Sequence, residues 1–172
     1  MNDLLDWSRL QDGNFRLSIE QLNLRNELCT VMELSAYSAA QKEINLINDV
    51  DENVTVPADK NMIHLVLRNL IANGIKFTPR GGTVRVSTAD KDNSIELVVE
   101  DSGVGISETN IQKLFRIDIN HTTKGTQNET GSGFGLILCK EIIDKHSGEI
   151  RIESKLNQGS RFIITLPKAA GI

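Results

Sequence analysis

The sequence is poor in the features that would assign it to several large classes of protein. It has only two cysteines and three prolines among 172 residues, and aromatic side chains make up 4%. Cys29 and Cys139 follow no metal-binding spacing, so we expect two buried, reduced thiols rather than a disulfide framework or a zinc site. No apolar run is long enough to cross a membrane, and the first residues do not follow a signal-peptide pattern.

An excess of basic residues is also absent. The chain has 19 Lys and Arg residues against 23 Asp and Glu residues, which gives a formal net charge of −4. This charge argues against a nucleic-acid binder, because such proteins usually carry a basic surface. The length suits one domain, or one domain with a short appendage. A chain of this size buries roughly 70% of its unfolded surface and needs neither a metal nor disulfides to stay folded.

The hydrophobic patterns predict alternating helices and strands. Helices are expected at 2–11, 23–42, 59–78 and 108–115, and from the glycine-rich stretch at 131–135 to about residue 146. Strands are expected where Phe15, Leu17 and Ile19 alternate with polar residues, and at 44–50, 54–56, 83–89, 94–100, 150–153 and 162–166. This order predicts the α+β class, as a two-layer α/β sandwich in which helices pack on one face of a mixed sheet.

One expected helix carries an unusual polar stripe. Asn69, Asn73 and Lys76 follow one another at spacings of four and three, so they share one face of a helix. Asp59 is a suitable N-cap for this helix, and Thr78-Pro79 should end it. Taken alone, the stripe is better explained by a solvated surface than by a binding site.

A second candidate feature is an acidic loop after the expected strand 94–100. Asp101 stands at the strand end, and Gly103 and Gly105 allow the backbone to approach a flat ligand closely. A carboxylate only accepts hydrogen bonds at neutral pH, so Asp101 could accept one from the exocyclic amino group of a purine. An acidic turn beside a hairpin is the alternative.

The third feature is the stretch Gly131-Ser132-Gly133-Phe134-Gly135-Leu136, which leads into a helix. Backbone N–H groups at a helix N-terminus make a suitable site for phosphate. The stretch is not a P-loop, and Leu136 occupies the third glycine position of the dinucleotide fingerprint. A glycine-rich helix entry that binds no ligand remains the alternative for this stretch alone.

The three features, in this order, resemble the N box and the two glycine boxes of the Bergerat ATP-binding fold. The resemblance covers about residues 14–168 and is greatest to the catalytic ATP-binding domain of sensor histidine kinases. It implies ATP and Mg²⁺ as cofactors, with Asn73 as the Mg²⁺ ligand, Asp101 on the adenine amino group and residues 116–131 as a lid. The ATP-binding positions that it implies are Asn69, Asn73, Lys76, Phe77, Asp101, Gly103, Gly105, Ile106, Gly131, Ser132, Gly133, Phe134, Gly135 and Leu136.

The same resemblance suggests how the chain divides. Residues 1–12 are similar to the end of the helix hairpin that carries dimerisation and the phosphoacceptor histidine, and 13–172 would be the catalytic domain. Most of that hairpin, with its acceptor histidine, is expected to be missing. His64, His121 and His146 are each expected to be structural or exposed rather than catalytic. Leu114-Phe115 matches the start of the family's F box, but Asp118 stands where a second phenylalanine is common.

Three functions are compatible with this fold. ATP-hydrolysing machines of the gyrase, mismatch-repair and heat-shock type usually carry a glutamate, as general base, at the position of Asn69 and an acidic residue at that of Lys76. Both departures favour a kinase, with a hydrolase second and a nucleotide-binding scaffold third. A kinase implies two partners: a dimerisation and phosphoacceptor domain, and a response-regulator receiver. We expect a cytoplasmic domain that contacts neither membrane nor nucleic acid, whether or not its parent protein is membrane-anchored.

Overall fold

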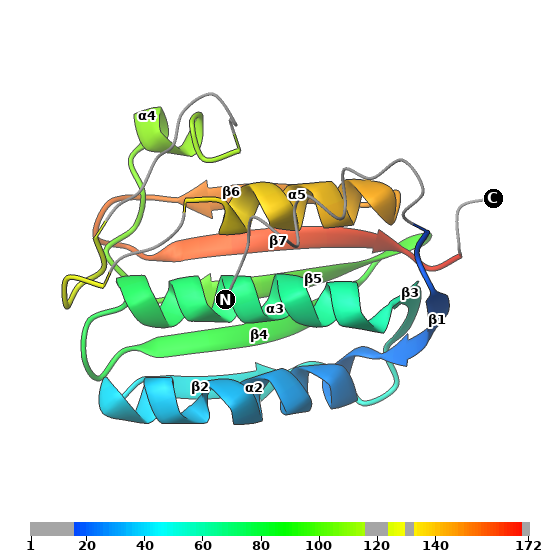
Figure 1. The fold of residues 1–172 in the computed structure, drawn as a ribbon, viewed down its shortest axis with the longest axis horizontal. Coiled ribbons are helices and arrows are strands. Elements are labelled where there is room, and N and C mark those ends of the chain that lie inside the picture. Colours follow the sequence, from blue (N-terminus) through cyan, green and yellow to red (C-terminus); the bar gives the residue numbers. More distant parts are fainter. Residues whose placement is uncertain (1–15, 116–123, 130–132, 170–172) are drawn as a thin grey trace.

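The fold is a mixed sheet with helices on one of its faces (Figure 1). A computed structural model describes residues 16–115, 124–129 and 133–169. The sheet has the strand order β2-β4-β5-β7-β6, formed by β2 (Asn45–Asp49), β4 (Thr83–Asp90), β5 (Ser94–Asp101), β7 (Ser160–Pro167) and β6 (Glu149–Ser154). Strands β2 and β4 are parallel, and the other neighbours are antiparallel. The expected α+β sandwich with a mixed sheet is therefore confirmed.

Three helices lie side by side over this sheet (Figure 1): α2 (Leu24–Gln41), α3 (Lys60–Phe77) and α5 (Gly135–Lys145). The short helix α4 (Glu108–Ile111) lies beyond them, past the end of the glycine-containing loop. Strands β1 (Ile19–Asn23) and β3 (Thr55–Asp59) form a separate antiparallel pair. Within the described residues, no helix is both long and apolar enough to cross a bilayer.

Alternation along the strands separates the core from the solvent. The helix-facing side of the sheet buries Val84, Val86, Ile95, Leu97, Val99, Ile150, Phe162, Ile164 and Leu166. Most residues between them are polar or charged and lie on the outer face, where Arg151 pairs with Glu96 at 3.0 Å and Arg161 pairs with Glu153 at 2.8 Å. Val98 and Ile163, paired in the middle of that face, are apolar and buried. The sheet therefore has one apolar face against the helices and one largely polar outer face, as a two-layer sandwich requires.

Helix α3 is the central helix of this layer, and the sequence determines both of its ends. Asp59 is the N-cap, and its carboxylate accepts from the Met62 N–H at 3.2 Å. The helix ends before Pro79, with Thr78 extended as the C-cap. Its buried residues are Ile63, Leu65, Val66, Leu67, Leu70, Ile71, Gly74 and Ile75. A Cβ added at Gly74 would lie 3.0 Å from the Val84 side chain, so the missing side chain lets α3 pack closely on β4.

A histidine joins the start of α3 to the end of α5. The Asp59 N–H donates to His146 Nε2 at 3.0 Å, and His146 Nδ1 lies 2.7 Å from the Ile142 carbonyl oxygen. Because a carbonyl only accepts, the proton resides on Nδ1. His146 is buried and fully hydrogen-bonded, so its role is structural.

Three expected elements differ from the observed ones, and the helix expected at 2–11 lies outside the described residues. The strand expected at 54–56 is β3, which continues to Asp59 because it pairs with β1 along its whole length. The strand predicted around Phe15, Leu17 and Ile19 begins only at Ile19, which is 44% exposed, and extends to Asn23. Its single partner is β3, so only Leu22 reaches the core; Phe15 lies outside the described residues. Helix α4 ends at Ile111 rather than at residue 115, because the next N–H groups, those of Lys113 and Leu114, donate to carbonyl oxygens three residues back, which is the pattern of a turn.

The cysteine expectation is correct for one residue and wrong for the other. Cys139 is buried and Cys29 is exposed, and both are free thiols. The buried positions of α2 include Leu24, Leu28 and Val31, a spacing that places Cys29 at the edge of the buried stripe, where its Sγ accepts from Asn48 of the edge strand β2 at 3.3 Å.

Replacing the N-cap of α3 should destabilise the protein. The Asp59 carboxylate also accepts from the Ser18 N–H at 2.8 Å, so Asp59→Ala leaves two backbone donors without their acceptor. We expect the free energy of unfolding in urea to fall by about 2 kcal/mol. Asp92→Ala, in the exposed turn between β4 and β5, is the control and should cost less than about 0.5 kcal/mol. Equal losses in the two variants would contradict this role of Asp59.

Candidate functional site

A cavity of about 350 Å³ opens at the carboxyl end of β5. The end of α3, the loop 102–107, α4 and the turn between β6 and β7 surround it. Its lining residues are Asn73, Phe77, Asp101, Val104, Gly105, Ile106, Ser107, Asn110, Leu114, Lys124, Leu136, Leu156, Asn157, Ser160 and Phe162. Apolar walls with a few polar groups are typical of a small-molecule site.

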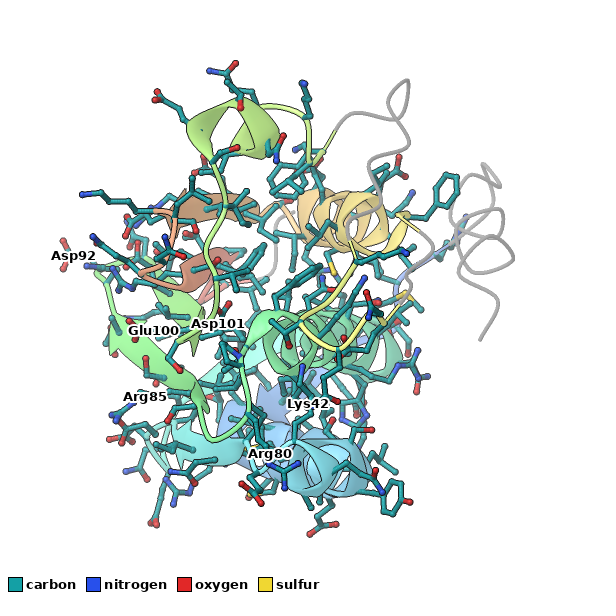
Figure 2. The ribbon with its side chains drawn as sticks, turned by 90° about the vertical axis from the view of Figure 1, so that its left-hand side faces the viewer. Lys42, Arg80, Arg85, Asp92, Glu100 and Asp101 are labelled. Atoms are coloured by element: carbon teal, nitrogen blue, oxygen red, sulfur yellow. The ribbon has the colours of Figure 1, made fainter. Side chains whose placement is uncertain are left out.

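Asp101 supplies the acidic group of this cavity. It is the last residue of β5 and is buried between the sheet and the helices, whereas Arg85 and Glu100 lie on the outer face of the sheet (Figure 2). Burial raises the pKa of the Asp101 carboxyl from 3.8 to about 6, and hydrogen bonds from the backbone of Gly103 and Ser160 oppose part of that rise. The Gly103 N–H donates to Asp101 Oδ1 at 2.8 Å. The carboxylate is thus oriented by the backbone of its own loop.

The two glycines of this loop allow close contact within the protein. A Cβ at Gly103 would lie 2.5 Å from both Asp101 Oδ1 and the Phe77 carbonyl oxygen. Gly105 has a φ of +69°, and a Cβ there would overlap the Lys155 carbonyl oxygen. Gly105 also lines the cavity, whereas Gly103 acts on it through Asp101. Any larger residue at either position would move the loop away from α3 or from the β6–β7 turn.

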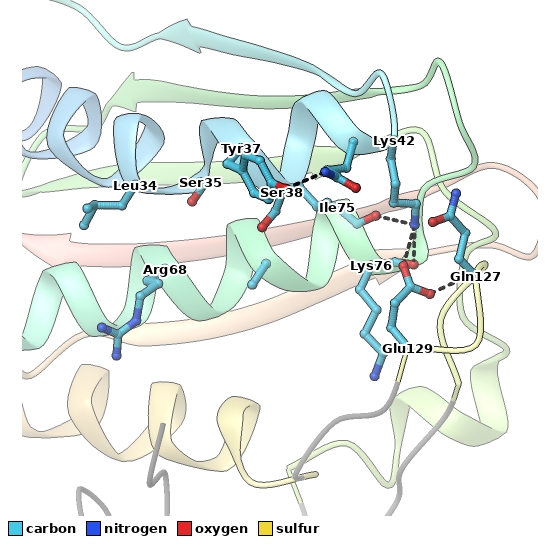
Figure 3. A pocket seen from close by; sticks show the side chains of 12 residues that line it. Leu34, Ser35, Tyr37, Ser38, Lys42, Arg68, Ile75, Lys76, Gln127 and Glu129 are labelled. Carbon is cyan, nitrogen blue, oxygen red and sulfur yellow. Dashed lines mark hydrogen bonds and ion pairs between the residues drawn. The ribbon is translucent and has the colours of Figure 1, made fainter.

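The structure places the three residues of the polar stripe on α3, Asn69, Asn73 and Lys76, in different surroundings. Asn73 lines the cavity, together with Phe77. The Asn69 side chain donates to the Leu65 carbonyl oxygen at 3.0 Å, and its Oδ1 faces Gly135, where an added Cβ would lie 3.0 Å away. Lys76 Nζ lies 4.7 Å from the Phe77 ring centroid, and burial lowers the pKa of this lysine. Lys76 lines a different, open groove of about 520 Å³ between α2 and α3, which contains neither Asn73 nor Asp101 (Figure 3).

The described part of the glycine-rich stretch lies where α5 begins. Gly133 has a φ of +76°, which favours glycine, Phe134 is the N-cap, and Gly135 is the first residue of the helix. Leu136 reaches the cavity, as does Ile106 from the acidic loop. Gly131 and Ser132 lie outside the described residues, as do most of the expected lid and His121.

The sequence pattern did not identify one side of the cavity. Leu156 and Asn157, in the turn between β6 and β7, line it, and the Asn157 N–H donates to the Val104 carbonyl oxygen at 2.7 Å. The residues Asn157-Gln158-Gly159 are typical of a turn, and Asn157 indeed has a positive φ of 62°. No local signal could place that turn against the loop 102–107, because the pairing of β6 with β7 and of β7 with β5 brings them together.

Comparison with known families assigns the chain. The model of the histidine kinase-, DNA gyrase B- and HSP90-like ATPases matches residues 58–170. The chain belongs to this family. The match begins just before α3 and continues beyond β7, so this ATPase domain includes every described residue that lines the cavity.

The curated relatives of this ATPase domain are sensor kinases. The histidine protein kinase DivJ of Caulobacter vibrioides is 32% identical over 97% of the chain and 28% of its own length. A sensor-like histidine kinase of Rhizobium meliloti is 31% identical over 99% of the chain and 33% of its own length. The autoinducer 2 sensor kinase/phosphatase LuxQ of Vibrio parahaemolyticus is 29% identical over 97% of the chain and 20% of its own length. The chain thus spans between a fifth and a third of these proteins.

Solved structures place the ATPase domain more narrowly. The catalytic domain of the histidine kinase ThkA is 30% identical, with a TM-score of 0.77 over 88% of the chain and 97% of that domain. Full-length ShkA, in complex with AMPPNP, has a TM-score of 0.82 at 25% identity, over 99% of the chain and 36% of ShkA. The chain is therefore a histidine-kinase-type ATPase catalytic domain. The expected family and function class are confirmed.

The raised pKa of Asp101 predicts how stability depends on pH. The folded state binds a proton at this carboxyl more readily than the unfolded state, so the contribution of Asp101 is greatest below pH 4 and is lost as the pH rises to about 6. A shift of about two units corresponds to at most roughly 3 kcal/mol.

Asp101→Asn removes this titration. The free energy of unfolding of the wild type, relative to Asp101→Asn, should therefore decrease between pH 4 and pH 7. Urea unfolding of both proteins across this range measures the difference. A difference that stays constant or rises with pH would contradict a raised pKa.

Proposed function

We propose that the chain is the ATP-binding catalytic domain of a two-component sensor histidine kinase, which transfers the ATP γ-phosphoryl group to a histidine on a separate dimerisation domain. The observation that carries the proposal is the placement of a buried carboxylate, Asp101, and the carboxamide of Asn73 in one cavity. The similarity to the ThkA catalytic domain and to full-length ShkA supports the same assignment.

The adenine base would occupy the part of the cavity next to Asp101. Ionised Asp101 only accepts hydrogen bonds, which suits the exocyclic amino group of adenine and not the carbonyl oxygen that guanine has there. Phe77, Ile106 and Leu114 supply apolar surface for the base. The fixed Gly103–Asp101 hydrogen bond means that the acceptor is already oriented before nucleotide binds.

Asn73 would hold Mg²⁺. Among the described residues, no cluster of three His, Cys, Asp or Glu side chains could bind a metal by itself. The Asn73 carboxamide lines the cavity, and among the described residues no group forms a hydrogen bond with it that would compete with a metal ion for its oxygen. One side-chain oxygen together with nucleotide phosphates and water is a typical Mg²⁺ environment, and the bound ion would neutralise phosphate charge.

The phosphates would lie toward the start of α5. The N-terminus of α5 and the Gly133–Gly135 backbone provide N–H groups for an anion. The proposal extends this contact to Gly131, Ser132 and Phe134, and it places Asn69 and Lys76 near the phosphates. Asn69, which packs at Gly135, is the better positioned of the two in this structure, because Lys76 faces the α2–α3 groove.

The reaction would be an in-line transfer. A nitrogen of the acceptor imidazole forms a bond to the γ-phosphorus while the bond from that phosphorus to the bridging oxygen breaks and ADP leaves. The proton on the other ring nitrogen passes to a base on the acceptor's own domain. Asn69 cannot accept a proton, and its side chain already donates to Leu65, so the domain is poorly suited to activating water.

The acceptor would come from another part of the parent protein. Of the described histidines, His64 Nε2 bonds Glu27 at 2.6 Å and His146 is buried at the end of α5; neither lines the cavity. We propose that residues 1–12 end the dimerisation hairpin and that 13–172 form the catalytic domain with a lid at 116–131. A response-regulator receiver would be the downstream partner. The structure of ThkA with the response regulator TrrA, 26% identical and with a TM-score of 0.76, supports that partner.

A phosphotransfer assay tests the proposal. The chain is incubated with Mg²⁺ and γ-labelled ATP, with or without the dimerisation hairpin of the same kinase as a separate fragment. We expect acid-labile phosphate on the hairpin only, and none on the chain. A hairpin whose acceptor histidine is replaced by glutamine is the control. ADP formed by the chain alone, at the rate seen with the hairpin, would identify a hydrolase instead.

The metal assignment has a separate test. Asn73→Ala should bring the ratio of the ATP dissociation constants without and with Mg²⁺ close to unity, because the ion loses its only proposed protein ligand. Isothermal titration calorimetry measures both constants. Asn45→Ala, on an exposed strand residue outside the cavity, should keep the wild-type ratio. A wild-type ratio in Asn73→Ala would place the metal elsewhere.

A further inference from the structure

Lys42 is a buried charged residue that the nucleotide site described above does not use. It is the C-cap of α2 and is only 4% exposed. A lysine is almost never buried to this extent unless its ammonium group is paired. Four oxygens surround its Nζ: the carbonyls of Ile75 at 2.8 Å and Lys76 at 3.0 Å, Thr126 Oγ1 at 2.7 Å and Glu129 Oε1 at 2.8 Å. Figure 3 shows Lys42 with Ile75, Lys76 and Glu129 around it.

These four oxygens belong to two different parts of the chain. The carbonyls of Ile75 and Lys76 are in the last turn of α3, where a helix leaves carbonyls without partners and favours a positive charge. Thr126 and Glu129 are in segment 124–129, 84 and 87 positions after Lys42. One ammonium group therefore joins the end of α2, the end of α3 and this segment.

Segment 124–129 forms a tight turn on the end of α3. The Thr126 N–H donates to the Lys76 carbonyl oxygen at 3.1 Å, and the Gly125 N–H donates to the Glu129 carbonyl oxygen at 2.9 Å. Glu129 Oε2 closes the turn by accepting from the Gln127 N–H at 2.7 Å. A Cβ at Gly125 would lie 2.6 Å from Lys76 Cγ, so the segment contacts α3 directly.

The charge of Glu129 supports the same arrangement. Burial alone would raise the pKa of its carboxyl, but hydrogen bonds from Lys42 and from the backbone of the turn lower it below its ordinary value. Glu129 is therefore a carboxylate near neutral pH and pairs with Lys42 as an ion. Charge-assisted hydrogen bonds of this kind are stronger than neutral ones.

The segment also reaches the nucleotide cavity. Lys124, which directly precedes the turn, lines the cavity together with Asn73 and Phe77 of α3. We propose that Lys42 is a positioning residue: it holds segment 124–129 against the end of α3 and thereby sets the position of Lys124 at the cavity. The expected effect on ATP binding rests on the proposed function. The attachment of segment 124–129 to the end of α3 does not depend on it.

Two measurements on the whole chain test this inference. Amide hydrogen exchange of residues 125–128 reports the attachment without nucleotide, and calorimetry reports the ATP dissociation constant. Lys42→Met and Glu129→Ala should each raise exchange at 125–128 by at least about tenfold, because each loses at least the charge-assisted hydrogen bond between Lys42 and Glu129. Each should also raise the ATP dissociation constant several-fold. The double variant should raise each readout by less than the product of the two single effects, because both substitutions remove the Lys42–Glu129 ion pair.

Glu129→Ala leaves the contacts of Lys42 with Ile75 and Lys76, so the test does not depend on Lys42→Met folding. The control is Lys140→Met, which removes an ion pair with Asp144 of similar length, 2.9 Å, on the exposed face of α5. It should change neither readout, and exchange in β5 should stay constant in all variants.

Unchanged exchange at 125–128 in Glu129→Ala would overturn the attachment. Raised exchange with an unchanged ATP dissociation constant would overturn the positioning role. A wild-type chain that binds no ATP would instead refute the proposed function, and the exchange data would still decide the attachment.

Discussion

Helix α3 can pack closely on β4 only because Gly74 has no side chain. An added Cβ would lie 3.0 Å from Val84 and 3.6 Å from the Cβ of Asp101, so α3 and the end of β5 are fixed relative to each other at this point. Asn73 and Phe77, on either side of Gly74, consequently face the same cavity as Asp101. The geometry of the site therefore depends on one close helix–sheet contact, with the apolar face of α3 buried around it.

Charges are buried near this contact, and each is compensated in a different way. Asp101 accepts hydrogen bonds from backbone N–H groups, yet burial still raises its pKa. Its negative charge is therefore only partly compensated. Lys42 has oxygen atoms on several sides, including the last carbonyls of α3. The Asp101 carboxylate can therefore still accept a hydrogen bond from a ligand. The ammonium group of Lys42 already has all its hydrogen bonds within the protein, so its role is structural.

Local signals predicted the elements whose ends are determined by neighbouring residues. The limits of α3 follow from Asp59 and Pro79, and the β4–β5 hairpin follows from two alternating stretches and a short polar turn. Where local signals failed, packing decided the outcome. The first strand was displaced toward Asn23 because its pairing with β3 depends on a distant partner, and Cys29 is exposed because the buried stripe of α2 excludes it.

The sequence by itself determined the family and the order of the chemical groups, because motif spacing on a helix, a strand end and a helix entry is a local property. It placed Asn73 on a helix and Asp101 at the end of a strand, but it could not separate Asn73 from Lys76, which line different cavities. Only the tertiary structure brought the β6–β7 turn against the loop after β5, and Glu129 against Lys42. The physical reason is that these partners lie far apart in the chain, and packing of the sheet and helices alone decides which distant groups meet.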